Sequence, residues 1–315
     1  MSTEQLSFLA SHIVSSQNFP ESNFSNNSLY KEINAGKMTK LHAGRYIAKD
    51  VYAQLNVYEK YLVKLLAVVT TLKDPIISHI SAAYILNLSV PYYQNTMHFR
   101  VTHKKNSRNN LVKFHHYLQK CNTVTTSTIV HTDVIDTVLD CARECSYEIA
   151  LCVADSACRK YKITKTQLQE RFGSFKTCNA TSRIQKIISN CTPKAESPGE
   201  TLCRIALAKI GLTTLKMQYC VNVSGSKYRT DFYFPAANLI IEFDGNEKYY
   251  GKYGDAKKQI DHERDRDAKV IANGYNIVHL DWKTIHNPLD LLSKLVSYVP
   301  ALSKTIITRQ MALNC

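Results

Sequence analysis

Three strand-like segments in close succession constrain the fold of this chain more than any other part of its sequence. They are Met217–Val223, Tyr228–Phe234 and Leu239–Asp244. The turns between them are short enough for an antiparallel meander. Helical patterns flank the meander at Glu200–Lys209 and Asp261–Asn273, and a further strand, Tyr275–Leu280, and a helix, Leu289–Tyr298, follow. We therefore expect an α/β domain in which helices flank a mixed sheet.

Acidic side chains stand within these apolar strands. Alternation along the third segment places Glu242 and Asp244 on one face, and Asp231 lies across the hairpin from them. Clustered carboxylates repel one another and are costly to bury unless a cation neutralises them. Hydrated Mg²⁺ needs only one or two carboxylates plus substrate phosphates, and Mn²⁺ accepts the same ligands. Asp231 and Glu242 are our candidate metal ligands; the alternative is strand-end acids in solvent, paired with nearby basic side chains.

The spacing of these acids resembles a known pattern. Asp231, ten intervening residues and then Glu242-Phe243-Asp244 resemble the core of the PD-(D/E)XK phosphodiesterases. Residues 197–283 as a whole are similar to the branch related to very-short-patch-repair (Vsr) endonucleases. The resemblance implies a restriction-endonuclease-like fold and a metal-dependent nuclease. It also implies that Glu200, Asp231 and Glu242 are its catalytic acids.

The lysine of the family's E-x-K signature is replaced in this chain. Asp244 occupies that position, as is usual in the Vsr-related branch, and is counted among the catalytic positions. The branch commonly has a histidine three residues after the following glycine, where this chain has Lys248. The resemblance implies that Lys248 positions water or stabilises the pentavalent phosphorus, but a simple contact with phosphate explains it equally well.

Basic and aromatic residues near the acids suggest contacts with nucleic acid. Tyr249 and Lys252 belong to a stretch that interleaves tyrosines with lysines, which suits stacking on an unpaired base beside backbone contacts. Arg264 matches a charged turn that the Vsr-related branch carries beside its active site. The alternatives are ordinary loop tyrosines and a solvated helix face held by charge pairs four residues apart.

Positive charge is concentrated in the front of the chain. The 315 residues carry a net charge of +14. Residues 1–195 hold 24 Lys and Arg against 13 Asp and Glu, a net of +11, and residues 196–315 hold 16 against 13, a net of +3. A basic front half suggests a polyanionic partner, most economically DNA, because neutralised phosphates release counterions.

A short helix followed by a basic hairpin is expected near the N-terminus. After an opening helix at Glu4–Ser15, the short helix falls at Leu29–Ala35 and the hairpin at residues 37–50. This order is typical of a winged helix-turn-helix, and the hairpin supplies the candidate DNA contacts. These contacts are Lys37, Lys40 and Arg45.

The order of segments over most of residues 25–170 resembles the Abi-E type antitoxins of bacterial abortive-infection systems. The matching stretches include INAGKMTKLHAGRYIA, ISHISAAYILNL and ALCVADSACRKYKITKTQL. The resemblance implies a winged helix-turn-helix followed by an α-rich domain, for which helices are expected at residues 57–72, 76–88 and 132–160. The expected domains are 1–50 (winged helix-turn-helix), 51–192 (α-rich connector), 196–300 (endonuclease-like) and 301–315 (tail).

Cysteines and histidines are numerous, but their spacing does not predict a metal site. The ten cysteines include no Cys-x-x-Cys pair, and Cys141, Cys145 and Cys152 fall at the helical spacing of a buried core. Six histidines gather in the middle of the chain: His79, His98, His103, His115, His116 and His131. None shows the spacing of a helical metal motif, so we expect them to contact protein or DNA.

These patterns lead to one principal hypothesis and one alternative. The chain is expected to be a Mg²⁺-dependent DNA endonuclease or nickase, recruited to DNA by its basic front half, in bacterial defence or mobile-element conflict. The alternative is an antitoxin-like transcriptional regulator or a nuclease-fold subunit of a larger nucleic-acid complex, catalytically silent alone. Apolar runs too short for a membrane helix and unpaired cysteines favour the cytoplasm and no membrane partner.

Overall fold

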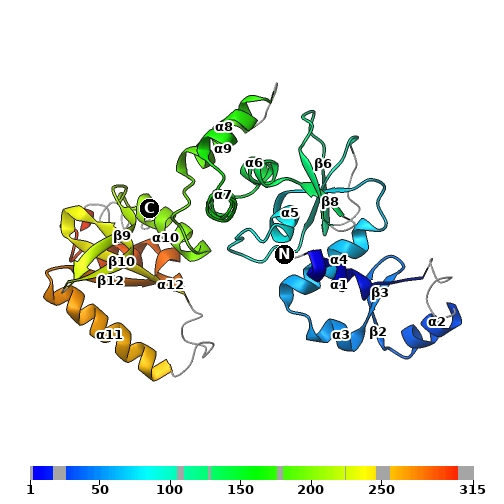
Figure 1. Cartoon of the computed structure of the whole chain (residues 1–315), viewed down its shortest axis with the longest axis horizontal. Helices are drawn as coiled ribbons and strands as arrows, with labels where there is room; N and C mark the ends of the chain where they lie inside the picture. Colours follow the sequence, from blue (N-terminus) through cyan, green and yellow to red (C-terminus); the bar gives the residue numbers. More distant parts are fainter. Residues whose placement is uncertain are drawn as a thin grey trace, which may run out of the picture. The chain divides into compact units, whose positions relative to one another are not determined.

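The computed structural model describes residues 3–16, 26–104, 110–126, 129–175, 180–223, 225–245 and 256–303, with only the backbone of residues 26–28 and 256–263. These residues form thirteen α-helices and three β-sheets, one antiparallel and two of mixed strand orientation (Figure 1). The chain divides into two compact units, which are Met1–Ser146 with Ile163–Ser189, and Tyr147–Lys162 with Asn190–Cys315. The expected α/β class is confirmed.

The first unit opens with a three-stranded sheet in the order β1-β3-β2. Its strands are β1 (Val14–Ser15), β2 (Met38–His42) and β3 (Arg45–Ala48), and its helices are α1 (Thr3–Ser11), α2 (Asn26–Asn34), α3 (Lys49–Gln54) and α4 (Val57–Val69). The expected hairpin is present, and Gly44 takes the positive φ of 65° that its turn requires. The expected helix Glu4–Ser15 ends early, because Val14 and Ser15 pair with β3.

A five-stranded sheet follows in the same unit, in the order β6-β5-β4-β8-β7. Its strands are β4 (Ile76–Ile77), β5 (Met97–Arg100), β6 (Val112–His115), β7 (Thr123–Thr126) and β8 (Ile129–Thr132). The sequence analysis did not predict this sheet within the α-rich connector expected at residues 51–192. The helix expected at 76–88 shortens to α5 (His79–Ile85), because Ile76 and Ile77 pair with β5 on one side and β8 on the other.

Three more helices belong to the first unit: α6 (Val134–Glu144), α8 (Lys165–Gly173) and α9 (Thr181–Asn190). The single helix expected at 132–160 is in fact two helices. Cys145 adopts an extended backbone (φ −79°, ψ 166°) that ends α6, and α7 (Tyr147–Tyr161) then begins the second unit. Cys141, Cys145 and Cys152 are buried, as their spacing predicted.

The second unit contains a four-stranded mixed sheet in the order β12-β11-β10-β9. Its elements are α10 (Pro198–Lys209), β9 (Lys216–Val223), β10 (Ser226–Phe234), β11 (Leu239–Asp244), α11 (Ala256–Ala272), β12 (Asn276–Asp281), α12 (Trp282–His286) and α13 (Pro288–Leu295). β9, β10 and β11 form the expected antiparallel meander, and β12 joins β11 in parallel. This order of elements confirms the prediction for residues 200–298.

Helices cover both faces of this sheet (Figure 1). On one face, Ile240 of β11 packs with Val270 of α11 in a buried cluster. Successive side chains of a strand point to opposite faces, so Phe243 belongs to the other face, where it meets Gly199 of α10. The buried Asp155 of α7 accepts hydrogen bonds from the Thr201 hydroxyl and the Arg204 guanidinium, which ties α7 to α10.

We predict that Gly199→Ala destabilises the second unit. A Cβ at this position would lie 2.0 Å from the Phe243 ring, so α10 or the ring must move. Overpacking of this kind costs about 1–3 kcal/mol, measurable by urea unfolding. Gly173→Ala is the matched control, because a Cβ there meets nothing within 4 Å. Equal unfolding midpoints for the two variants would contradict the close packing of α10 on β11.

Candidate functional site

The sheet of the second unit places Asp231 and Glu242 on neighbouring strands. Pairing between β10 and β11 ends at Phe232↔Ile241, so Asp231 and Glu242 are the next residues along the two strands. The backbone N–H of Phe243 donates a hydrogen bond to Oδ2 of Asp231 (3.0 Å). The Asp231 side chain therefore satisfies a backbone donor where the strand pairing stops.

Glu242 is the more strongly perturbed of these two acids. The Tyr228 hydroxyl donates a hydrogen bond to its Oε1 atom (2.8 Å). Burial raises the pKa of Glu242 to about 7, and the neighbouring charge of Asp231 adds to the increase. A bound cation would stabilise the ionised form of such a carboxyl group.

Glu200 reaches the same cluster from α10. Its side chain is 6% exposed, and Oε2 accepts hydrogen bonds from the Glu196 N–H (2.9 Å) and the Gln218 amide (3.2 Å). Burial raises the pKa of Glu200, and Asp231 raises it further. Asp231 thus acts electrostatically on both glutamates, but the carboxylate oxygens of the three acids do not all lie within 4.8 Å of one another.

Asp244 lies beside the three acids but has a different partner. Its Oδ2 atom is 2.9 Å from Nδ1 of His279 on β12, and Nε2 of His279 is 2.9 Å from Oδ2 of Asp267 on α11. These contacts, led by the one with Asp244, raise the pKa of His279 to about 9. The imidazolium therefore bridges two carboxylates at neutral pH.

Two cations face Glu242 within the described part of the second unit. Both His279 and Arg266 of α11 act to lower the pKa of Glu242, against the larger effects of burial and Asp231. The Arg266 guanidinium also lies over the Tyr228 ring, 4.9 Å from its centroid. Arg266 thus supports the tyrosine that hydrogen-bonds Glu242.

Three of the predicted nucleic-acid contacts are exposed in the described part of the chain. Lys37 and Lys40 are exposed on the first unit, where Lys37 forms an ion pair with Glu32 (3.2 Å), and Arg264 is exposed on α11. Lys248, Tyr249 and Lys252 lie outside the described residues.

Arg45 requires a correction. Its side chain is 8% exposed and donates hydrogen bonds to the hydroxyls of Ser15 and Thr70 (both 2.8 Å). The basic residues of the hairpin suggested that Arg45 lies at the surface. Instead, β1 and the end of α4 enclose its guanidinium. We therefore withdraw Arg45 from the expected DNA contacts.

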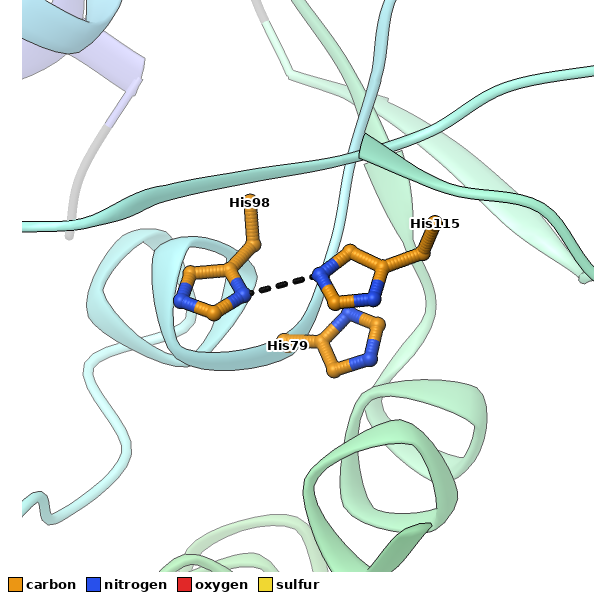
Figure 2. Close-up of side chains that lie close together, drawn as sticks. All are labelled: His79, His98 and His115. Atoms are coloured by element: carbon orange, nitrogen blue, oxygen red, sulfur yellow. Dashed lines mark hydrogen bonds between the residues drawn. The ribbon is translucent and has the colours of Figure 1, made fainter. Parts of the chain in front are cut away.

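A second cluster, which the sequence did not predict, lies in the first unit. His79, His98 and His115 are buried with their rings stacked on or beside one another (Figure 2). One ligand atom from each lies within 4.8 Å of the others, and among the described residues this is the only such group of three or more His, Cys, Asp or Glu. The histidines come from a helix start and two strands, so sequence spacing carries no sign of their proximity.

The sequence analysis also missed Tyr228 and His279 as partners of the acids. A signal for His279 exists in the strand pattern, because a parallel β12 beside β11 places it opposite Glu242. Tyr228 lies on the same strand as Asp231, but its reach to Glu242 depends on the geometry of the sheet.

Comparison with known proteins adds no assignment. No family model matches the sequence, and no curated protein matches it. Within the described residues, no helix is both long enough and apolar enough to cross a membrane.

We predict that His279→Gln destabilises the protein in a pH-dependent way. The pKa of His279 in the folded state, about 9, exceeds the ordinary value of 6.5. Its stabilising contribution is therefore complete below about pH 6.5 and is lost as the pH rises through 9. The difference in urea midpoint between wild type and variant should be large at pH 6 and small at pH 10.

The exposed His286 of α12 provides the control for this measurement. The His286→Gln variant should shift the midpoint little at either pH. A pH-independent effect of His279→Gln would show that the imidazolium does not bridge Asp244 and Asp267.

Proposed function

We propose that this protein is a metal-dependent phosphodiesterase that cuts DNA as an endonuclease or nickase. The observation that carries this proposal is that Asp231 and Glu242 lie at adjacent positions of two neighbouring strands, where burial and the charge of Asp231 raise the pKa of Glu242 and also that of Glu200 on α10. Strained acid clusters of this kind are typical of functional sites.

The order of elements supports the proposal. A helix, three antiparallel strands, a helix and a parallel fourth strand follow one another from α10 to β12. This is the arrangement that the resemblance to PD-(D/E)XK nucleases led us to expect, with the acids on α10, β10 and β11. The fold family therefore stays part of the proposal, on the basis of the sequence resemblance and this order.

The donor set suits Mg²⁺ or Mn²⁺. Asp231 and Glu242 would hold the ion, because both offer carboxylate oxygens and the charge of Asp231 disfavours an ionised Glu242 in the absence of a cation. A bound divalent ion would activate water for attack and neutralise charge that develops on the phosphodiester. Glu200, more deeply buried on α10, would add negative charge behind the two ligands.

The remaining side chains position the acids. Tyr228 fixes one oxygen of Glu242, and the Phe243 N–H fixes one oxygen of Asp231. His279 holds Asp244, which occupies the position of the missing E-x-K lysine, and carries a positive charge there. We propose that His279 orients Asp244 and helps to balance the negative charge of a bound phosphate.

Recruitment to DNA is assigned to the first unit. The β2–β3 hairpin exposes Lys37 and Lys40, and residues 1–195 carry most of the net positive charge. Together with the resemblance to Abi-E type antitoxins, this supports a winged helix-turn-helix that docks on the phosphate backbone. The biological setting that both resemblances imply is bacterial defence or mobile-element conflict.

One observation favours the alternative of a non-cleaving regulator or complex subunit. Asp244 stands where the family has its lysine and is held by His279. If the bridge between Asp244 and His279 has only a structural role, the second unit would serve as a binding platform. That alternative predicts tight binding to specific DNA without cleavage, with Mn²⁺ present.

The Asp231→Asn/Glu242→Gln variant tests the proposal directly. Wild type should nick supercoiled plasmid with Mg²⁺ or Mn²⁺ and be silent with EDTA. The variant should lose about 100-fold or more of that rate, because the metal ligands supply several kcal/mol of transition-state stabilisation. Linear DNA, single-stranded DNA and RNA serve as parallel substrates.

The matched control is Asp265→Asn, which removes an exposed acid of α11 that pairs with Lys269. It should keep the wild-type rate. Equal rates for wild type and the double variant on every substrate would refute the nuclease assignment.

A further inference from the structure

Three buried imidazoles meet at the edge of α5 in the first unit. His79 begins α5, His98 lies on β5 and His115 on β6, and all are nearly inaccessible to solvent. Nδ1 of His98 is 2.9 Å from Nε2 of His115, and the His79 ring stacks on His115 with centroids 3.7 Å apart (Figure 2). Polar rings are seldom buried together in this way without a ligand or a complete hydrogen-bond network.

Side chains outside the cluster contact both nitrogens of His79 and one nitrogen of His115. Nδ1 of His115 is 3.3 Å from Oε1 of Glu144, and Nε2 of His79 is 2.9 Å from the Tyr117 hydroxyl. A carboxylate or hydroxyl on one ring nitrogen is the usual way in which proteins orient a metal-binding imidazole. The nitrogens that could turn to an ion are Nδ1 of His98 and Nε2 of His115, which contact each other, and Nδ1 of His79, which would have to exchange its 2.9 Å contact with the Ser78 hydroxyl.

The charge state and backbone of the cluster suit metal ligands. Burial lowers the pKa of His98 to about 3 and that of His79 well below its ordinary value, so both rings are neutral, as coordination requires. His79 also adopts a left-handed backbone (φ 53°), which costs free energy for a residue other than glycine. Strain of this kind is often retained at functional sites.

We propose that His79, His98 and His115 bind one divalent transition-metal ion of the Zn²⁺ class. Imidazole nitrogen suits Zn²⁺, Cu²⁺, Ni²⁺ and Fe²⁺, whereas Mg²⁺ prefers oxygen. Three protein ligands leave a fourth position of a tetrahedral ion for water or a substrate. The carboxylates of Glu144 and Asp140 lie 3.3 Å from His115 and 3.9 Å from His79, and each also pairs with a cation, Lys113 and Arg100 respectively.

Coordination requires a small, defined rearrangement. Zn–N bonds of about 2.0–2.1 Å in a tetrahedron separate the nitrogens by about 3.3 Å, so the 2.9 Å contact between His98 and His115 must open slightly. The ring of His79 must turn out of its stack on His115 so that Nδ1 points at the ion. A cavity of about 480 Å³ has Tyr117 and Glu144, which contact His79 and His115, in its lining.

The proposal is tested on the full-length chain with Zn²⁺ and Co²⁺ alone. Metal-free wild type that is incubated with Zn²⁺ should still carry about one equivalent of the ion after gel filtration. Its thermal unfolding midpoint should rise when Zn²⁺ is added. Co²⁺ should give the visible bands of a four-coordinate ion without the near-ultraviolet thiolate bands that the ten cysteines would produce. The affinity of His98→Asn should fall by about 100-fold or more.

Two control variants separate this site from other sources of metal binding. His131→Asn removes a buried histidine outside the cluster and should bind Zn²⁺ like wild type. The Asp231→Asn/Glu242→Gln variant should also retain the Zn²⁺, since the histidine cluster is independent of the proposed nuclease site. If His98→Asn does not fold, the wild-type Co²⁺ spectrum decides. Failure of wild type to bind, a spectrum of thiolate ligands alone, or unchanged affinity in a folded His98→Asn variant would overturn the proposal.

Discussion

The repulsion between Asp231 and the two glutamates beside it is the constraint on which the second unit depends. Glu200, Asp231 and Glu242 are held in a sheet and helix whose other side chains are mostly apolar, where burial raises the pKa of both glutamates and the charge of Asp231 adds to the increase. Such a cluster weakens the fold unless a cation or a proton relieves it.

The packing of the second unit fixes this cluster in place. Gly199 lets α10 approach the Phe243 ring, and the next residue of α10, Glu200, is near enough to Asp231 for its charge to raise the pKa of Glu200. Asp231 binds the backbone N–H of the same Phe243, so one residue of β11 connects the helix packing and the carboxylate geometry. On the other face, α11 contributes Arg266 and Asp267, which reach the acids through Tyr228 and His279. Each acid is thus oriented by a contact from another element.

Local patterns predicted much of this architecture, and non-local contacts account for what they missed. Alternation and turn spacing identified β9, β10, β11 and β12, because each of these strands is at least six residues long. The two-residue strands β1 and β4 carry no detectable period, since only their partners define them. The sequence did not predict the histidine cluster for the same reason. Its members lie on α5, β5 and β6, and only the tertiary fold brings them together.

The acids themselves were predictable, but their partners were not. Asp231 and Glu242 stand out as charges in apolar strands, which alternation alone reveals. That Asp244 pairs with His279 depends on the parallel register of β11 and β12, and the burial of Arg45 depends on β1 and α4. In both cases the residue type suggested a contact with substrate, and tertiary packing assigned it a partner within the protein.

The central claim is that Asp231 and Glu242 form a divalent-metal site. Crystals of the protein soaked in Mn²⁺, with data collected at a wavelength where manganese scatters anomalously, measure this directly. The account predicts an anomalous peak at coordination distance from a carboxylate oxygen of each residue, and its loss in the Asp231→Asn/Glu242→Gln variant. A well-ordered map with no manganese at these two carboxylates would contradict it.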